Sequence, residues 1–298
     1  MLDTVIIGGG AAGITASLYL GRFRRRVVVL DTATQANRVS HAAHGFFTRD
    51  GTPPAELIQI GQEQLRPYET VSLQARAATA VTRDEGYFRI TLDDGSALTS
   101  RKVLLATGLK DTLPPVVSIE QFWGTSVLHC PYCDGWEWRD QPIAILNDGT
   151  SALHIAKLLR VLTDDLILCT HGSKLLNEAD RASLQGYGVR VIDTPIHHIE
   201  GDNAKVEGIV FVDDHKIARK AIFVQLTSIQ QAPFAVQLGC RMTSLTLVEV
   251  DELGRTSVPG VYAAGDLANR IRQVAMAVAQ GASAAVGINT DLIAEDFA

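Results

Sequence analysis

The chain has 298 residues, of which 46% are hydrophobic and 20% are charged, and its formal net charge is −6. This length is sufficient for two domains that each bury a core, and the negative charge argues against nucleic acid or an anionic membrane surface as the main partner. The sequence has no apolar run of the roughly 18–20 residues that span a bilayer and no signal-peptide pattern at its start, so we expect a cytoplasmic protein without a membrane partner.

The predicted elements follow one another in an order typical of two α/β units. In chain order they are a strand at 4–7, a helix at 11–20, a strand at 26–30, a hairpin over 87–108, a strand at 142–146, a helix at 151–162, a strand at 165–170, a helix at 177–187, a strand at 189–193, a hairpin-like segment over 197–226 and a helix from about residue 271. The strand-helix-strand pattern therefore occurs twice, and the segments 113–115 and 230–233 are typical of linkers.

This repetition predicts an α/β fold of two Rossmann-like, three-layer ββα nucleotide-binding domains, the second inserted into the first. The predicted first domain consists of residues 1–113 and 233–298, and the inserted domain consists of residues 114–232.

The pattern Gly8-x-Gly10-x-x-Gly13 lies between the first strand and the first helix, which is the context that makes it specific. Gly8 permits a tight turn, Gly10 lets the backbone approach a pyrophosphate, and Gly13 allows close helix–strand packing. Free N–H groups at the helix N-terminus face the phosphates, and Asp31 ends the next strand, where an acid binds a ribose hydroxyl. Two further residues of this helix start are counted as cofactor-binding, Ala11 and Ala12. The glycines alone do not distinguish FAD from NAD.

The pair Cys130-Pro-Tyr-Cys133 admits several interpretations. A zinc site needs four ligands, whereas Cys169 and Cys240 are isolated and His129 is a poor third ligand, so we expect no metal. Haem attachment needs a histidine after the second cysteine, a glutaredoxin-type pair lies near the start of a small domain, and two unreactive thiols remain a possible alternative. A redox dithiol is favoured, because thiol pKa values in such pairs are commonly lowered and exchange proceeds through a mixed disulfide.

The run VPGVYAAGD at 258–266 ends a predicted strand, and Arg272-Gln273 follows it. With the glycine motif and the cysteine pair, these residues resemble the low-molecular-weight thioredoxin reductases, a group of flavoprotein disulfide reductases, over nearly the whole chain. The resemblance implies FAD as the first cofactor. By the same resemblance, residues expected near FAD are Asn37, His41, Ala106, Thr107, Gly108, Gly265, Asp266, Arg272, Gln273 and Val274.

The resemblance also implies roles at the redox pair. Cys130 would meet the substrate, Cys133 would face the flavin, and Asp134 would donate a proton. A buried carboxylate beside a thiolate should have a raised pKa, which suits general acid work. Asp134 alternatively acts as a helix N-cap, and the two roles are compatible. The resemblance further implies a two-fold homodimer and an inserted domain that rotates. If NADPH does not bind, that rotation has no purpose, and a fixed orientation is the alternative.

The second nucleotide-binding turn departs from the family pattern. Asn147 stands at the turn glycine, and Asp148 brings a negative charge close to the expected pyrophosphate. The 2′-phosphate of NADPH needs guanidinium groups, yet residues 169–174 read CTHGSK, and no arginine precedes Arg181. We therefore expect NADPH binding to be degraded; the alternative is a drifted motif that still binds weakly.

A degraded NADPH site resembles two kinds of relative. One comprises ferredoxin- or flavin-linked reductases of thioredoxin-like proteins, and the other comprises dithiol oxidases that close small-molecule disulfides with oxygen as acceptor. Residues 134–137, DGWE, fit the pattern of the oxidases. The unusual segment 41–51, HAAHGFFTRDG, either lines the substrate side of the flavin with His41, His44 and Phe46 or only packs on the flavin ring.

The sequence as a whole favours an FAD-dependent dithiol/disulfide oxidoreductase that acts on a thioredoxin-like protein disulfide without NADPH. The alternatives are an oxidase of a small dithiol and, outside the enzymes, a flavin-bound redox sensor.

Overall fold

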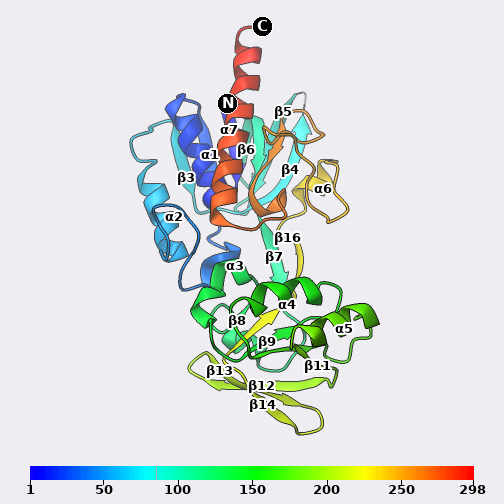
Figure 1. Cartoon of the computed structure of the whole chain (residues 1–298). Helices are drawn as coiled ribbons and strands as arrows, with labels where there is room; N and C mark the ends of the chain where they lie inside the picture. Colours follow the sequence, from blue (N-terminus) through cyan, green and yellow to red (C-terminus); the bar gives the residue numbers. More distant parts are fainter. Residues whose placement is uncertain (85) are drawn as a thin grey trace.

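Two β-sheet assemblies lie end to end and are joined by a pair of short strands (Figure 1). The computed structural model of the chain describes residues 1–84 and 86–298. Both termini lie on the same assembly, which also holds the long C-terminal helix (Figure 1). Within the described residues, no helix combines the length and the apolar character needed to cross a membrane.

The first assembly is built on a seven-stranded sheet of order β3-β2-β1-β6-β5-β4, in which β17 also pairs with β6. Its strands are β1 Leu2–Ile7, β2 Val27–Leu30, β3 Val71–Gln74, β4 Ala78–Asp84, β5 Tyr87–Leu92, β6 Ala97–Leu105 and β17 Val261–Ala263. The strands β3, β2, β1, β6 and β17 pair in parallel, whereas β5 pairs antiparallel with both β6 and β4. Because Val5 and Ile7 belong to one buried cluster and Ile6 to another, β1 is covered on both faces.

Helices α1 and α7 cover one face of this sheet (Figure 1). The helices of the assembly are α1 Ala11–Arg22, α2 Pro54–Glu63, α6 Phe234–Gln237 and α7 Val274–Asp296. The helix α7 packs directly against the start of α1, because a Cβ on Gly281 would lie 2.2 Å from the backbone oxygen of Ala12. Any larger residue at this position would force the two helices apart.

The second assembly has three layers. A parallel sheet of order β11-β10-β9-β15-β8 lies between two helices and a three-stranded antiparallel sheet. The elements are β8 Val127–Leu128, α3 Pro131–Asp134, β9 Ile143–Leu146, α4 Ala152–Arg160, β10 Leu166–Cys169, α5 Glu178–Gly186, β11 Arg190–Ile192, β12 Ile196–Asp202, β13 Lys205–Phe211, β14 Lys216–Ala218 and β15 Ala221–Val224. Along β9, Ile143 and Ile145 pack toward α4 while Ala144 and Leu146 pack toward β12 and β13, as the period-two alternation of a strand requires.

The predicted α/β class and the repeated strand-helix-strand unit are confirmed. The prediction of one hairpin-like segment over 197–226 is wrong at its end: β12, β13 and β14 form an antiparallel sheet, but β15 returns to the parallel sheet between β9 and β8. The apolar run of β15 gave no sign of its partner, because a buried strand looks the same in either kind of sheet.

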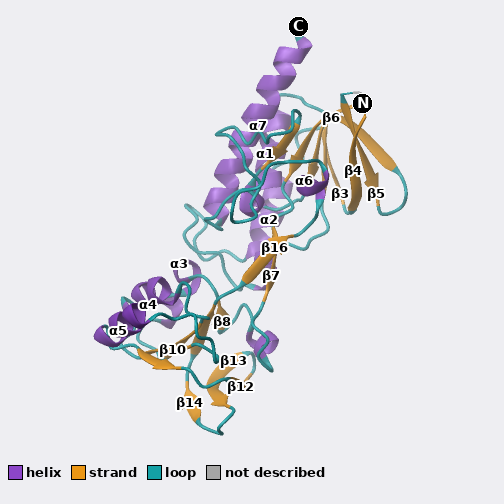
Figure 2. Cartoon of the chain, turned by 90° about the vertical axis from the view of Figure 1, so that its right-hand side faces the viewer, coloured by secondary structure: helices purple, strands orange, loops and turns teal. Residues whose placement is uncertain are grey.

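The two assemblies are connected by β7 Leu109–Thr112 and β16 Thr227–Gln230, which pair antiparallel (Figure 2). Neither strand was predicted. A largely buried ion pair ties this connection to the first assembly, because Arg272, just before α7, donates two hydrogen bonds of 2.8 Å to the carboxylate of Asp111 on β7. Ser228 on β16 donates to the same carboxylate at 2.6 Å. Burial opposes ionisation of Asp111, but the hydrogen bonds from Arg272 and Ser228 outweigh it and lower its pKa.

We expect Asp111→Ala to loosen the connection between the assemblies. Removing one partner of a buried pair typically costs about 3–5 kcal/mol when the remaining charge is left uncompensated. We expect a smaller cost here, because Arg272 keeps its ion pair with Asp266 at 3.3 Å. Hydrogen exchange measured by mass spectrometry should show faster exchange confined to β7, β16 and the residues before α7. Asp111→Asn, which keeps an acceptor, should give a smaller effect. Unchanged exchange of β7 and β16 in the alanine variant would show that the pair does not hold the connection.

Candidate active site

A cavity of about 390 Å³ lies at the carboxyl end of the first sheet and extends to α3 of the second assembly. Ligands of open α/β sheets bind at this end of the strands. Most of the residues that the sequence predicts to bind the cofactor line this cavity: Gly8, Gly10, Ala11, Ala12, Asp31, Asn37, Ala106, Thr107, Gly108, Gly265, Asp266, Arg272, Gln273 and Val274.

Two predicted cofactor residues lie elsewhere. Gly13 is buried behind the turn, where a Cβ would lie 1.9 Å from the backbone oxygen of Gly8, so its part is packing. His41 is exposed and is not among the lining residues; its Nε2 lies 3.3 Å from the hydroxyl of Thr125.

The turn between β1 and α1 fits a pyrophosphate. Gly8 has φ +116°, and a Cβ there would lie 2.1 Å from the backbone oxygen of Ala106, so glycine is required. Above Gly10 the space is open, since the nearest atom to a Cβ would be 3.8 Å away on Gln35. Among the described residues, no side chain caps the N-terminus of α1. The free N–H groups and the positive end of the helix dipole therefore face the cavity.

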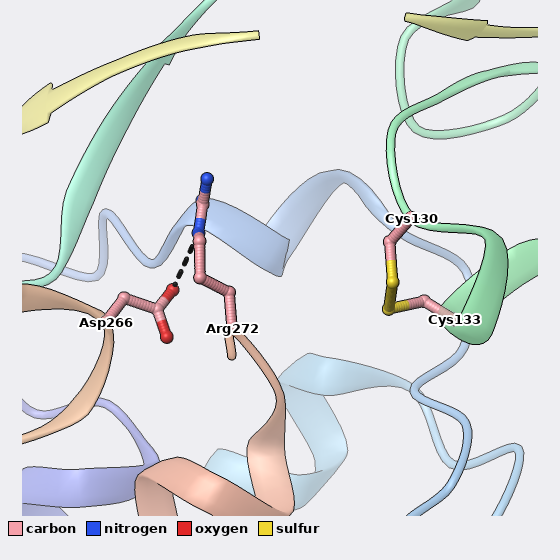
Figure 3. Close-up of a disulfide and its surroundings, with 4 residues drawn as sticks. All are labelled: Cys130, Cys133, Asp266 and Arg272. Atoms are coloured by element: carbon pink, nitrogen blue, oxygen red, sulfur yellow. Dashed lines mark hydrogen bonds and ion pairs between the residues drawn. A yellow bond between two sulfur atoms is a disulfide. The ribbon is translucent and has the colours of Figure 1, made fainter. Parts of the chain in front are cut away.

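The redox pair lies across the cavity from the approach to α7. Cys130 and Cys133 form a disulfide with a Cα–Cα distance of 5.3 Å, and Figure 3 shows it facing Arg272 and Asp266. The strand β8 ends two residues before Cys130, and Pro131 then begins the short helix α3. Cys133 lines the cavity, whereas Cys130 is not among its lining residues. The two cysteines thus differ in position, because Cys133 lies on the cavity wall and Cys130 does not.

Asp134 also lines the cavity, beside Cys133. Burial and then the negative charge of Glu137 raise the pKa of Asp134 to about 6, while His44 opposes the shift. The carboxyl group can therefore exchange a proton near neutral pH. The alternative that Asp134 caps a helix N-terminus is wrong, because it is the last residue of α3 and Cys130 holds the N-cap position.

The second turn, between β9 and α4, differs from the first in how its amides are used. Three successive N–H groups donate to side chains: that of Asp148 to Gln225 Oε1 at 3.0 Å, that of Gly149 to Asn147 Oδ1 at 2.8 Å, and that of Thr150 to Asp148 Oδ1 at 2.9 Å. Asn147 and Asp148, the two departures from the family pattern, thus take up donors that a pyrophosphate would use. Gln225, at the end of β15, is a third contributor that the sequence did not indicate.

The next strand end offers little to a 2′-phosphate. Arg181 is bound to Asp193 Oδ1 at 3.0 Å, and the same oxygen accepts the hydroxyl of Thr170 at 2.8 Å. His171 accepts the backbone N–H of Ile196 through Nδ1 at 2.9 Å. The guanidinium group of Arg181 and one ring nitrogen of His171 are therefore already bound within the protein.

Some residues that line the cavity were left open by the sequence, and others were not predicted to be part of the site. Of the segment 41–51, Ala42, Ala43 and His44 line the cavity, so His44 is the member of the predicted trio that the structure brings to the site. Asp111 and His129 line it as well. Burial, and then the charge of Arg272, lower the pKa of His129 to about 4, so this imidazole is neutral at physiological pH. The one available signal for His129 was its place directly before the redox pair.

A dinucleotide turn and a redox disulfide that share one cavity define a disulfide oxidoreductase with a dinucleotide cofactor. Residues 2–281 match the family described as "Pyridine nucleotide-disulphide oxidoreductase", and the chain belongs to this family.

The chain is 29% identical to thioredoxin reductase sirT of Leptosphaeria maculans over 322 aligned residues, which cover 100% of this chain and 96% of that protein. Among solved structures it resembles HlmI with a TM-score of 0.96 and 34% identity, covering 99% and 94% of the two chains. An oxidoreductase from Agrobacterium tumefaciens gives a TM-score of 0.91 and 30% identity, covering 98% of each chain. The protein is therefore a low-molecular-weight thioredoxin reductase-like flavoprotein, an FAD-dependent disulfide oxidoreductase, as the resemblance implied.

We expect the rate at which an external dithiol reduces the flavin to rise with an apparent pKa of about 6, as Asp134 becomes a carboxylate able to accept the thiol proton. Asp134→Asn should abolish this rise and slow the reaction by about 10²–10⁴-fold. Anaerobic stopped-flow absorbance at the flavin band, from pH 5 to pH 8, measures both. The same pH profile in the variant would exclude Asp134 as the titrating group.

The same group gives a thermodynamic check. Its pKa in the folded protein is above the ordinary value of 3.8 for an aspartate, so between about pH 4 and pH 6 the folded protein holds a proton that the unfolded chain has released. As the pH rises through this interval, the free energy of unfolding of the parent protein should therefore fall relative to that of Asp134→Asn.

Proposed function

We propose that the protein oxidises dithiols to disulfides, with FAD and the pair Cys130–Cys133 as carriers of the electron pair and without a pyridine nucleotide. The observation that carries this proposal is the β9–α4 turn, whose three successive amides are occupied by Gln225, Asn147 and Asp148. A pyrophosphate would have to displace those partners and approach the carboxylate of Asp148. With that route unfavourable, a substrate dithiol is the electron source that needs no further partner protein.

The two cysteines divide the exchange chemistry between them. A substrate thiolate attacks the sulfur of Cys130, which breaks the Cys130–Cys133 bond and forms a mixed disulfide. The second substrate thiol then attacks the substrate sulfur of that mixed disulfide, releasing the product disulfide and leaving both cysteines reduced. The position of Cys133 on the cavity wall supports its role as the sulfur that faces the cofactor.

The β1–α1 turn, Asp31 and the residues before α7 would hold FAD, which would supply the acceptor for the electron pair of the reduced cysteines. Asp134 takes the proton that a substrate thiol loses, because its pKa of about 6 leaves it mostly ionised at neutral pH. With molecular oxygen as the final acceptor, the balanced reaction is R(SH)2 + O2 → R(S–S) + H2O2.

A second candidate is reduction of a thioredoxin-like protein, with a ferredoxin or a reduced flavin as donor. Two observations favour it. The relative from Leptosphaeria maculans is named a thioredoxin reductase. In addition, Tyr132 between the two cysteines and Trp136 just after them are exposed large side chains of the kind that contact protein partners.

We expect the flavin band of the anaerobic protein to stay unchanged with NADPH or NADH and to bleach with dithiothreitol. Readmitted oxygen should restore the band rapidly, with one hydrogen peroxide formed per dithiol oxidised. Cys133→Ser serves as control, since it keeps the nucleotide turns intact but cannot pass electrons to the cofactor, and dithiothreitol should not bleach it at a comparable rate.

Prompt bleaching by NADPH would refute a nucleotide-independent function. Bleaching by dithiothreitol followed by slow reoxidation would instead favour the reductase, which should then reduce a thioredoxin-like protein when a ferredoxin or a reduced flavin supplies electrons.

A further inference from the structure

The segment 39–44 of the first assembly forms part of the wall of the main cavity. It begins at the last residue of the 3₁₀ helix η1 Ala36–Val39 and precedes α2. Five of its six residues line the cavity, and the sixth, His41, does not: the lining residues are Val39, Ser40, Ala42, Ala43 and His44. The same segment also contacts the second assembly at three places.

The first contact is between backbones. Gly124, in the turn before β8, has φ +80°, and a Cβ there would lie 2.6 Å from the backbone oxygen of Val39 and 2.8 Å from its Cγ2. The two segments therefore lie so close together that no side chain fits at Gly124 unless they separate. Gly124 also lines the cavity, so this contact forms part of its wall.

The other two contacts are between side chains. The Nε2 of His41 lies 3.3 Å from the hydroxyl oxygen of Thr125, which directly follows Gly124. The Nε2 of His44 lies 3.5 Å from Oε1 of Glu137, in the segment that follows α3. The start, the middle and the end of the segment 39–44 are thus each held by the second assembly.

These contacts lie at the end of the cavity that holds the redox pair. Glu137 is three residues from Asp134, which lines the cavity together with Cys133. In Figure 1 the segment, drawn in blue, reaches the second assembly near α3. The flavin ring of bound FAD would have to lie at this end, because it exchanges electrons with Cys133.

We propose that residues 39–44 are a strap that closes the seam between the two assemblies over this end of the cavity and retains FAD there. Each contact of the strap is modest by itself, but all three are made by one short segment, so they must open together before the cofactor is uncovered. The strap does not depend on the direction of electron flow, so it applies equally to an oxidase and to a reductase.

The first test is Gly124→Ala in the FAD-loaded protein. The added methyl group would press on Val39 and force the strap away from the second assembly. We expect FAD to leave about 10-fold faster, because overpacking closely packed atoms is costly. The fluorescence of FAD released after dilution measures the rate. Hydrogen exchange measured by mass spectrometry should be faster only in peptides that cover 36–44 and 123–128.

Gly188→Ala is the matched control, because Gly188 belongs to the same assembly and has a similar φ of +76°. Among the described residues, no atom lies within 4 Å of a Cβ at Gly188, so this variant has the backbone strain without the clash. It should release FAD at the parent rate. Equal release rates for the two variants would overturn the strap, as would faster exchange throughout the chain in Gly124→Ala.

A second variant tests the strap without adding a clash. Thr125→Val together with Glu137→Ala removes the partners of His41 and His44, and we expect FAD to leave about 3–10-fold faster. Glu120→Ala, which removes an exposed glutamate of the same assembly, should keep the parent rate. A double variant that also releases FAD at the parent rate would overturn the proposal, even if Gly124→Ala does not fold.

Discussion

The backbone amides at the start of a helix have no partner within the helix and must be satisfied by something else. This protein has two such helix starts at the carboxyl ends of parallel strands. At α1, glycines leave open space and, among the described residues, no side chain caps the amides, which fits a dinucleotide phosphate. At α4, three neighbouring amides donate to side chains of the protein itself. The same fold thus provides one open site and one that is internally satisfied.

The position of the redox pair at the cavity depends on the contact between the two assemblies. Cys133 and Asp134 belong to the second assembly, yet both line the cavity whose other walls come from the first. The buried pair of Arg272 and Asp111 holds the connecting strand β7 against the residues before α7. Removing one partner of a buried ion pair is costly. The pair of Arg272 and Asp111 therefore helps to hold the disulfide at the cavity.

The parts of the site that were predictable from sequence are those set by local backbone geometry. Gly8 and Gly10 belong to a turn that requires a positive φ and open space. These requirements fix a glycine spacing that can be recognised in the sequence. Cys130 and Cys133 are three residues apart, so the short helix brings them together. The raised pKa of Asp134 was also expected, because burial disfavours the charged form of a carboxyl group and so raises its pKa.

The remaining features depend on contacts between distant segments. Arg272 was predicted to lie near the flavin, but nothing in its surroundings along the chain indicated that it binds Asp111, 161 residues away. Likewise, Gln225 reaches the β9–α4 turn from the end of β15, a strand predicted in the wrong arrangement. The sequence left His44 between two interpretations, because Glu137, which lies 3.5 Å from its Nε2, belongs to the other assembly. Side chains such as these have no characteristic spacing, since tertiary packing alone brings them together.

A fixed orientation of the two assemblies would be sufficient for the proposed function. An enzyme that takes electrons from a nicotinamide must bring a third group to its flavin, and the inserted domain of the thioredoxin reductase family is expected to move for that reason. Here the amides that would hold such a nucleotide are already bonded, while Cys133, Asp134 and Arg272 line one continuous cavity. Under the proposed function, a substrate dithiol would need only to reach Cys130, which is not among the residues that line the cavity. The internally bonded turn and the clamping of the connecting strands are therefore physically consistent with the proposed function, because an enzyme that used no nucleotide would gain nothing from the motion that the clamp opposes.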